Sequence, residues 1–131
     1  MRITKDNIHK FIYGSLMDCS DKGITRLEYI PDGITSLWCE HNKLTELPKL
    51  PDSLVELWCS NNQLTELPKL PESLTNLYCQ YNQLTELPKL PNSITSLWCY
   101  KNNLPYIVTI ENFKEHNTLL KRKEILKRIC G

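Results

Sequence analysis

The chain repeats the unit Leu54-Val-Glu-Leu-Trp-Cys-Ser-Asn-Asn-Gln-Leu-Thr-Glu-Leu-Pro-Lys-Leu-Pro-Glu-Ser73 with a period of 20 residues, and full units begin at residues 34, 54, 74 and 94. A unit this short cannot bury its own apolar side, so neighbouring units must stack into one continuous core. Three columns recur when positions are counted from the start of each unit. They are leucine at position 4 (Leu37, Leu57, Leu77, Leu97), cysteine at position 6 (Cys39, Cys59, Cys79, Cys99) and asparagine at position 9 (Asn42, Asn62, Asn82, Asn102).

The pattern weakens toward both ends of the chain. Before residue 34 we expect a shortened unit over residues 24–33, with residues 24–29 at positions 1 to 6 and residues 30–33 at positions 17 to 20. After residue 94 the frame continues to Ile107 and Ile110, at positions 14 and 17. All eight prolines lie inside this repetitive region. The sequence therefore predicts repeats over residues 24–110.

Residues 56–59 alternate polar and apolar, which predicts a short strand with Leu57 and Cys59 inward and Glu56 and Trp58 outward. Stacked units would join these strands into a parallel sheet. In residues 67–71, Pro68 and Pro71 exclude a regular helix and favour an extended, polyproline-like return. The predicted fold is an α/β repeat solenoid with a short parallel sheet on its concave face and an extended convex side.

The pattern LxxLxCxxNxLTxLPxLPxS resembles the leucine-rich repeat family over residues 24–110. Its 20-residue length and Leu-Pro-x-Leu-Pro segment are similar to the repeats of bacterial type III secreted effectors. Short cysteine-containing units are also similar to leucine-rich repeat proteins of giant DNA viruses. The resemblance implies that the asparagine column is a ladder satisfying backbone groups at the turn after each strand. It also implies a host protein partner if the origin is an effector or a virus.

The cysteine column is expected to be a reduced, buried ladder. Parallel side chains on strands ~4.8 Å apart do not bring their Cβ atoms to disulfide distance, and four collinear thiols cannot surround a zinc ion. We place Cys19 and Cys130 outside the column. No apolar segment follows the charged N-terminus as in a cleavable signal, and no run is long enough to cross a membrane. These features predict a reducing, intracellular location: the cytoplasm, or the host cytoplasm for an effector or viral protein.

Exposed solenoid ends require caps. Residues 1–23 are expected to form a helical cap that begins after Thr4 and gathers Ile8, Phe11 and Ile12 on one face. Residues 111–131 are expected to form a basic helical cap. Two interpretations of its Lys and Arg side chains stay open: a solvated face, or a docking surface for an acidic partner, nucleic acid or an anionic membrane. The apolar residues of this helix are Phe113, Leu119, Leu120, Ile125, Leu126 and Ile129.

The outward positions 3, 5, 7 and 8 form the concave face, and position 5 is aromatic in every full unit, with Glu28 at this position in the shortened unit. Aromatic side chains at strand spacing would form a ridge, which stabilises a sheet but is also enriched at binding hot spots. The candidate partner-binding residues are Trp38, Trp58, Tyr78, Trp98, His41, Tyr81, Tyr100, Lys101 and Glu56.

We expect a non-catalytic protein-interaction module, without metal or cofactor, that binds a partner protein through this aromatic face. The three histidines fall in separate regions, and no phosphate-binding or HExxH motif is present. A net charge of +1 gives no general attraction to nucleic acid. Two alternatives stay open: a structural or self-associating repeat protein, and a carbohydrate or other small-ligand site on the tryptophans.

Overall fold

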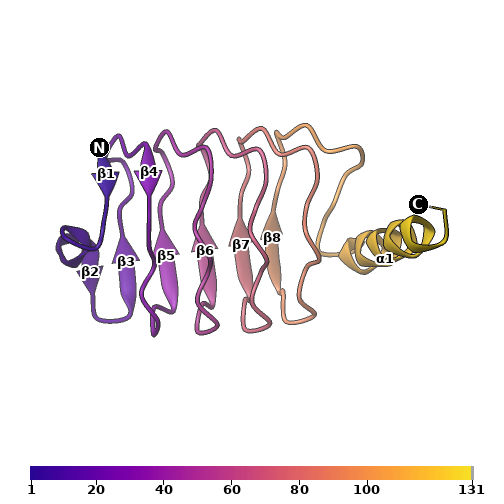
Figure 1. Ribbon diagram of the computed structural model, residues 1–131, viewed down its shortest axis with the longest axis horizontal. Helices are drawn as coiled ribbons and strands as arrows, with labels where there is room; N and C mark the ends of the chain where they lie inside the picture. The colour runs from indigo at the N-terminus through magenta and orange to yellow at the C-terminus, as the bar shows by residue number, and fades with distance from the viewer. Residues whose placement is uncertain (131) are drawn as a thin grey trace.

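The computed structural model describes residues 1–130, so Gly131, the last residue of the expected C-terminal cap, lies outside the described residues. The described chain forms a single row of stacked coils with a helix at its C-terminal end (Figure 1). Its elements are β1 (Arg2–Ile3), the 3-10 helix η1 (Ile8–Phe11), β2 (Ile12–Tyr13), β3 (Leu16–Asp18), β4 (Arg26–Leu27), β5 (Ser36–Trp38), β6 (Glu56–Trp58), β7 (Asn76–Tyr78), β8 (Ser96–Trp98) and α1 (Phe113–Cys130).

One six-stranded sheet runs along the stack in the order β2-β3-β5-β6-β7-β8. The strands from β3 to β8 are parallel, and each residue pairs with the residue 20 positions later, as Leu57 does with Leu77. We keep the name concave face for the solvent-facing side of this sheet. The predicted solenoid with a parallel sheet is confirmed.

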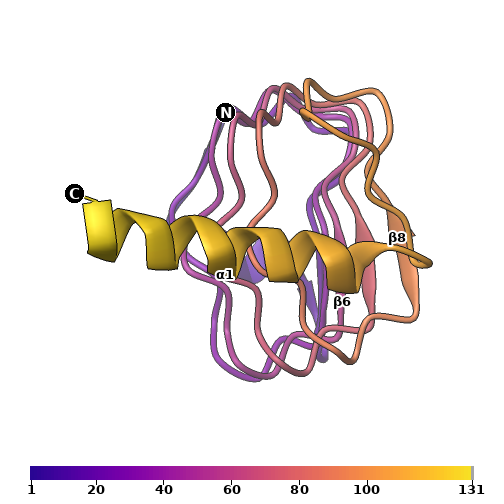
Figure 2. The ribbon, with the colours of Figure 1, turned by 90° about the vertical axis from the view of Figure 1, so that its right-hand side faces the viewer.

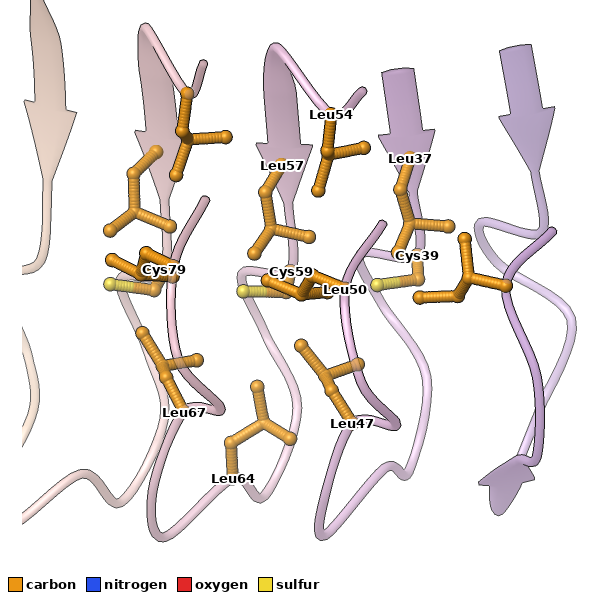
Figure 3. Close-up of a cluster of buried hydrophobic side chains, with 14 of the residues drawn as sticks. Leu37, Cys39, Leu47, Leu50, Leu54, Leu57, Cys59, Leu64, Leu67 and Cys79 are labelled. Atoms are coloured by element: carbon orange, nitrogen blue, oxygen red, sulfur yellow. The ribbon is translucent and has the colours of Figure 1, made fainter. Parts of the chain in front are cut away.

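The core is a column of side chains contributed by every coil (Figure 3). In the unit that begins at residue 54, Leu54, Leu57, Cys59 and Leu64 are fully buried, and Leu67 and Leu70 complete the interior. The side opposite the six-stranded sheet is an extended return in each full unit, as its prolines require. Each coil therefore buries its apolar side only against its neighbours.

The structure corrects the first unit. Strand β3, and not the segment around residue 26, pairs with β5: Met17 aligns with Leu37, and Cys19 N donates to Trp38 O at 2.8 Å. The unit therefore begins at residue 14 and is a full 20 residues long, with no deletion. The mistake has a simple cause, because an Ile/Leu-x-x-Leu spacing occurs at positions 1 to 4 and again at positions 11 to 14, and Ile24 occupies position 11.

Because the first unit begins at residue 14, two residues lie at other positions than the sequence predicts. Cys19 belongs to the buried cysteine column, whereas we had placed it outside. Glu28 is absent from the concave face. It follows β4, which pairs with β1 in a separate two-stranded sheet, and its carboxylate forms ion pairs with Arg2 and Arg26.

The N-terminal cap is mostly β structure and not the expected helix. Only residues 8–11 are helical, as one 3-10 turn, and Ile12, assigned to the helix face, pairs with Met17 in the antiparallel β2–β3 hairpin. The open edge of β3 offers backbone hydrogen bonds that a helix could not satisfy, which favours the hairpin. Its turn has Gly14 in the left-handed region at φ 65°. Ile3, Ile8 and Phe11 are buried beneath this cap.

The C-terminal end differs from the expected frame by one residue. Val108 is buried, while Ile107, expected at an inward position, is 81% exposed. The Cys99 thiol donates to Val108 O at 2.9 Å, so the chain crosses the end of the core at this residue. From there α1 runs across the open end of the last coil, and its C-terminal part extends beyond it (Figure 2).

Two polar side chains attach α1 to the preceding unit. The Asn117 amide accepts from Leu90 N at 2.8 Å and donates to Leu90 O at 2.7 Å. His116 is buried, and its Nε2 donates to Pro88 O at 3.1 Å while its Nδ1 lies 2.7 Å from the Tyr106 hydroxyl. Of the six apolar residues expected on this helix, Phe113 alone is buried; those that stay exposed are Leu119, Ile125, Leu126 and Ile129.

Candidate interaction surface

A continuous aromatic ridge runs along the concave face, formed by Trp38, Trp58, Tyr78 and Trp98. These residues are register partners on four adjacent strands. The rings of Trp38 and Trp58 stack with centroids 4.9 Å apart and planes 17° apart. The Tyr78 ring meets Trp58 edge-on, with centroids 5.5 Å apart. It lies tilted by 48° against Trp98, with centroids 5.0 Å apart. All four side chains stay partly open to solvent, and Trp98 at the end is 53% exposed.

The polar groups of the ridge are only partly satisfied. The Tyr78 hydroxyl lies 2.9 Å from Ser96 Oγ and accepts from the Asn76 amide at 3.1 Å. By contrast, the indole Nε1 groups of Trp38 and Trp58 are covered and have no hydrogen-bond partner among residues 1–130. A covered donor without a partner costs free energy.

The residues that flank the ridge separate into two sets. At position 3, the Glu56 carboxylate accepts from Ser36 Oγ at 3.1 Å and is therefore partly engaged. Toward the C-terminal end, Tyr81 and Tyr100 are exposed and in edge-to-face contact at 5.6 Å. Both are candidate residues that the structure brings beside Trp98.

Position 8 carries a constraint that the sequence did not reveal. Every residue there has a positive φ, although none is glycine; these residues are Asp21 (53°), His41 (57°), Asn61 (56°), Tyr81 (59°) and Lys101 (57°). The left-handed conformation turns the chain sharply after each strand. The candidate residues His41, Tyr81 and Lys101 therefore lie at this turn, on the rim of the concave face.

Two carboxylates at the N-terminal end of the ridge are not among the candidate residues predicted from the sequence. Asp18 is the register partner of Trp38 and extends the position 5 column by one strand, and Glu40 follows at position 7 of the next unit. The Glu40 Oε2 atom is covered and has no partner within the described chain. Burial and the neighbouring Asp18 raise the pKa of Glu40. Alignment of the first unit from residue 14 would have revealed both residues.

The asparagine column joins each unit to the one before it. Asn62 accepts from Leu44 N at 3.0 Å and donates to Cys39 O at 3.0 Å. The same pair of bonds recurs in each unit, formed by Asn42 with Ile24 N and Cys19 O, by Asn82 with Leu64 N and Cys59 O, and by Asn102 with Leu84 N and Cys79 O. These amides satisfy backbone groups at the turn after each strand.

The cysteine column is a row of free, buried thiols, and Cys130 is exposed. Figure 3 shows the sulfur atoms of Cys39, Cys59 and Cys79 pointing in the same direction. Burial raises the pKa of Cys59 to about 12 and of Cys99 to about 11. Buried thiols with such pKa values are inert near neutral pH and pack as small apolar groups.

The C-terminal end holds a cavity of about 750 Å³ lined by residues 97–102 and 104–111. It meets the ridge at Trp98 and continues toward Val108 and Ile110. At the same end of the chain, the Lys121, Arg122 and Lys123 side chains of α1 are exposed. The structure therefore places an apolar hollow and a basic helix together at this end.

Over the described residues, no helix is long and apolar enough to span a bilayer. Within residues 1–130, no group of three or more His, Cys, Asp or Glu side chains is placed to hold a metal ion.

Comparison with known proteins supports the fold and the repeat class. The family model described as Leucine Rich Repeat matches residues 53–74. Among solved structures, YopM from Yersinia enterocolitica WA-314 is 37% identical, with a TM-score of 0.70 over 72% of this chain and 21% of that chain. A Shigella effector leucine-rich repeat domain is 26% identical, with a TM-score of 0.56 over 82% of this chain and 57% of that chain. No curated protein matches the chain.

The coils, the register and these matches define a leucine-rich repeat protein. Its units are of the short bacterial effector type. The chain spans about a fifth of the YopM chain and a little over half of the Shigella domain, at 21% and 57%. The similarity to giant-virus proteins stays a prediction. Leucine-rich repeat solenoids generally serve as interaction scaffolds and not as enzymes, so the matches indicate a protein-interaction module.

Proposed function

We propose that this chain binds a partner protein through the aromatic ridge of its concave face. The observation that carries the proposal is the unbroken contact of four partly exposed rings across four strands, with successive centroids 4.9, 5.5 and 5.0 Å apart. Tryptophan and tyrosine supply large apolar contact areas and dominate binding hot spots.

The rim supports the same proposal. His41, Tyr81, Tyr100 and Lys101 line one edge of the ridge with exposed side chains, and all of these except Tyr100 are held at left-handed turns. A rigid apolar centre with a polar rim is the common anatomy of a protein interface. Roughly four outward residues on each of five parallel strands give about 20 residues, the lower end of a standard interface.

The test is capture of partners from a cell extract by wild-type protein and by a Trp58→Ala plus Trp98→Ala variant. We expect the double variant to lose the captured partner, because two central rings are removed. The control is Tyr13→Ala plus Tyr29→Ala, which removes two exposed aromatic rings that are not part of the ridge; Tyr13 is on β2, two strands from Trp38. If circular dichroism shows that all variants fold and both double variants capture the partner equally, the proposal fails. Trp98→Lys, at the exposed end, repeats the test with less risk to folding.

Self-association is the second candidate, and the open C-terminal end favours it. Ile107 and Ile129 are 81% and 74% exposed, and the sheet ends there at β8. An apolar patch beside a sheet edge is a common contact between copies of a chain. Sedimentation velocity at several concentrations tests this candidate. A monomer at all concentrations excludes it.

Carbohydrate binding stays a third prediction. The large cavity lies at the C-terminal end and meets the ridge only at Trp98. We also propose a reducing, intracellular location, since the five column cysteines are free and buried. Mass spectrometry of the protein isolated under thiol-trapping conditions checks this, and a disulfide involving Cys130 would contradict it.

A further inference from the structure

We infer that the N-terminal end of the aromatic ridge is an arginine-binding site, in which a partner's guanidinium group lies on Trp38 between Asp18 and Glu40. This inference rests on the proposed function and assigns a chemistry to one part of the same surface. The partner segment would carry an arginine at this end and apolar groups over the rest of the ridge.

The first step is the orientation of the Trp38 ring. One face of its indole ring stacks on Trp58 at 4.9 Å and 17°. The opposite face therefore points away from β6, toward β3 on the other side of β5. The residue in register on β3 is Asp18, so the flat face and the carboxylate are one strand apart, ~4.8 Å. A guanidinium fits such a pair, because it stacks on tryptophan and donates to a carboxylate at the same time.

The second step is charge. Asp18 Oδ1 accepts from Ser20 N at 3.2 Å and from Ser20 Oγ at 2.7 Å, which leaves its charge without a cation. Neither Asp18 nor Glu40 takes part in an ion pair within residues 1–130. Neither Lys22 nor His41 forms an ion pair with these carboxylates. By contrast, the carboxylate of Glu28, which follows β4 of the two-stranded sheet, forms ion pairs with both Arg2 and Arg26.

The third step is the buried acceptor. Glu40 Oε2 is covered without a partner, and burial together with Asp18 raises the pKa of this carboxyl group. A bound cation would offset the repulsion between the two carboxylates. At the other end of the ridge, Tyr100 occupies the position of Glu40, and in the described chain no strand beyond β8 supplies a counterpart of Asp18. The cation preference is thus confined to the N-terminal end.

The experiment titrates the ¹⁵N-labelled chain with N-acetyl-arginine amide and, in parallel, with its neutral citrulline analogue. The three indole N–H signals report binding separately at Trp38, Trp58 and Trp98. We expect arginine to shift the Trp38 signal in a saturable way, with a Kd of roughly 10 mM, and citrulline to shift it little. Asp18→Asn should weaken arginine binding by about fivefold, as the loss of one partner of a partly exposed ion pair predicts.

The matched control is Glu46→Gln, which removes one exposed carboxylate from the opposite side of the coil and should leave the Trp38 titration unchanged. The Trp98 indole signal verifies that each variant is folded. Equal shifts with arginine and citrulline, the largest shift at Trp98, or an Asp18→Asn titration equal to wild type would overturn the inference. Each of these results is independent of the capture experiment, so a partner lost with Trp58 and Trp98 but insensitive to Asp18→Asn contradicts the arginine site alone.

Discussion

The two ends of the solenoid close by different means. At the N-terminal end, β1 pairs with β4 and β2 pairs with β3, so the backbone of the first coil continues into the cap on both sides. Ile3, Ile8 and Phe11 are buried beneath it. At the C-terminal end, α1 crosses the last coil and is held by the side chains of Phe113, His116 and Asn117.

The difference shows that covering the apolar core and pairing the edge strand of the sheet are separate requirements. The N-terminal cap does both, because the two-residue antiparallel strand β2 ends the sheet where β3 would otherwise be open. The C-terminal helix covers part of the core but adds no strand beside β8 in the described chain. Exposed Trp98, Tyr100 and Ile107 remain at this end. We therefore expect the N-terminal end to resist perturbation as part of the solenoid, and the C-terminal end to respond locally.

The largest expected effect is at the N-terminal cap. Phe11→Ala should lower the free energy of unfolding by about 3–5 kcal/mol, because the ring is 4% exposed and its removal leaves a cavity over the first coil. Urea unfolding followed by tryptophan fluorescence measures this loss. Tyr13→Ala, an exposed aromatic two residues away, is the control and should cost under about 1 kcal/mol. Equal effects of the two changes would mean that the cap does not seal the core.

At the other end, Asn117→Ala should cost about 1–3 kcal/mol, since both backbone groups of Leu90 lose their partner. The loss should be local: hydrogen exchange should speed up at the Leu90 amide and along α1, and stay unchanged at Leu57. Thr118→Ala, exposed on the same helix, provides the matched control. Faster exchange throughout the sheet would show that the two ends are equally coupled to the solenoid.

The cysteine column gives a chemical comparison of the ends. Burial raises the pKa of Cys19 to about 12 and that of Cys99 to about 11. At a given alkaline pH, Cys99 should therefore form more thiolate and be alkylated faster. Exposed Cys130 should react first. Peptide mass spectrometry after timed iodoacetamide treatment at alkaline pH gives the order in which the cysteines are alkylated. Alkylation of Cys19 before Cys99 would contradict the predicted order.

The same pKa values fix the sign of the pH dependence. The folded chain keeps these thiols protonated, whereas the thiol of an unfolded chain has its ordinary pKa of 9.0. Above that pH the folded state binds more protons than the unfolded state, so stability should fall as pH rises from about 9 to about 12. Thermal unfolding across this range measures the slope, and Cys59→Ala should reduce it.

The smallest expected effect is at the left-handed turns. Lys101→Gly should stabilise the fold by roughly 0.5 kcal/mol, because glycine avoids the ~1–2 kcal/mol cost of this conformation but loses more chain entropy on folding. Asp21→Gly, at the equivalent turn near the N-terminus, should gain less, since aspartate tolerates positive φ better than lysine. Thermal unfolding of the two variants side by side would detect the difference. A destabilised Lys101→Gly would mean that its side chain matters more than its backbone.

The middle of the fold was predictable because every unit there has the same surroundings. Leu57 and Leu77 occupy identical positions against identical neighbours, so the spacing alone identified the inward columns and the parallel sheet. The extended return opposite the sheet followed from Pro68 and its equivalents in the other units. A residue type that recurs at one position of every unit therefore indicates the packing at that position.

The ends were not predictable in this way, and the first unit shows why. Each asparagine of the ladder bonds to the unit before it, as Asn42 does to Ile24 N and Cys19 O. The first unit has no predecessor, so Lys22 can replace asparagine at position 9, and the unit no longer matches the pattern. The aromatic residues of the concave face were found from the sequence, whereas Asp18 was missed because of this altered frame. The left-handed turns could not be predicted from the residue types, since His41, Tyr81 and Lys101 share no chemical property.

The constant register between strands also makes the length of this protein adjustable. Each junction from β5 to β8 repeats the same pairing with a 20-residue offset, so a unit inserted between residues 73 and 74 would meet its neighbours as the present units do. Recombination between such similar segments could lengthen or shorten the array in whole steps without altering either cap. Each added step would extend the concave face by one aromatic ring and ~4.8 Å. The reach of the surface could therefore evolve independently of its chemistry.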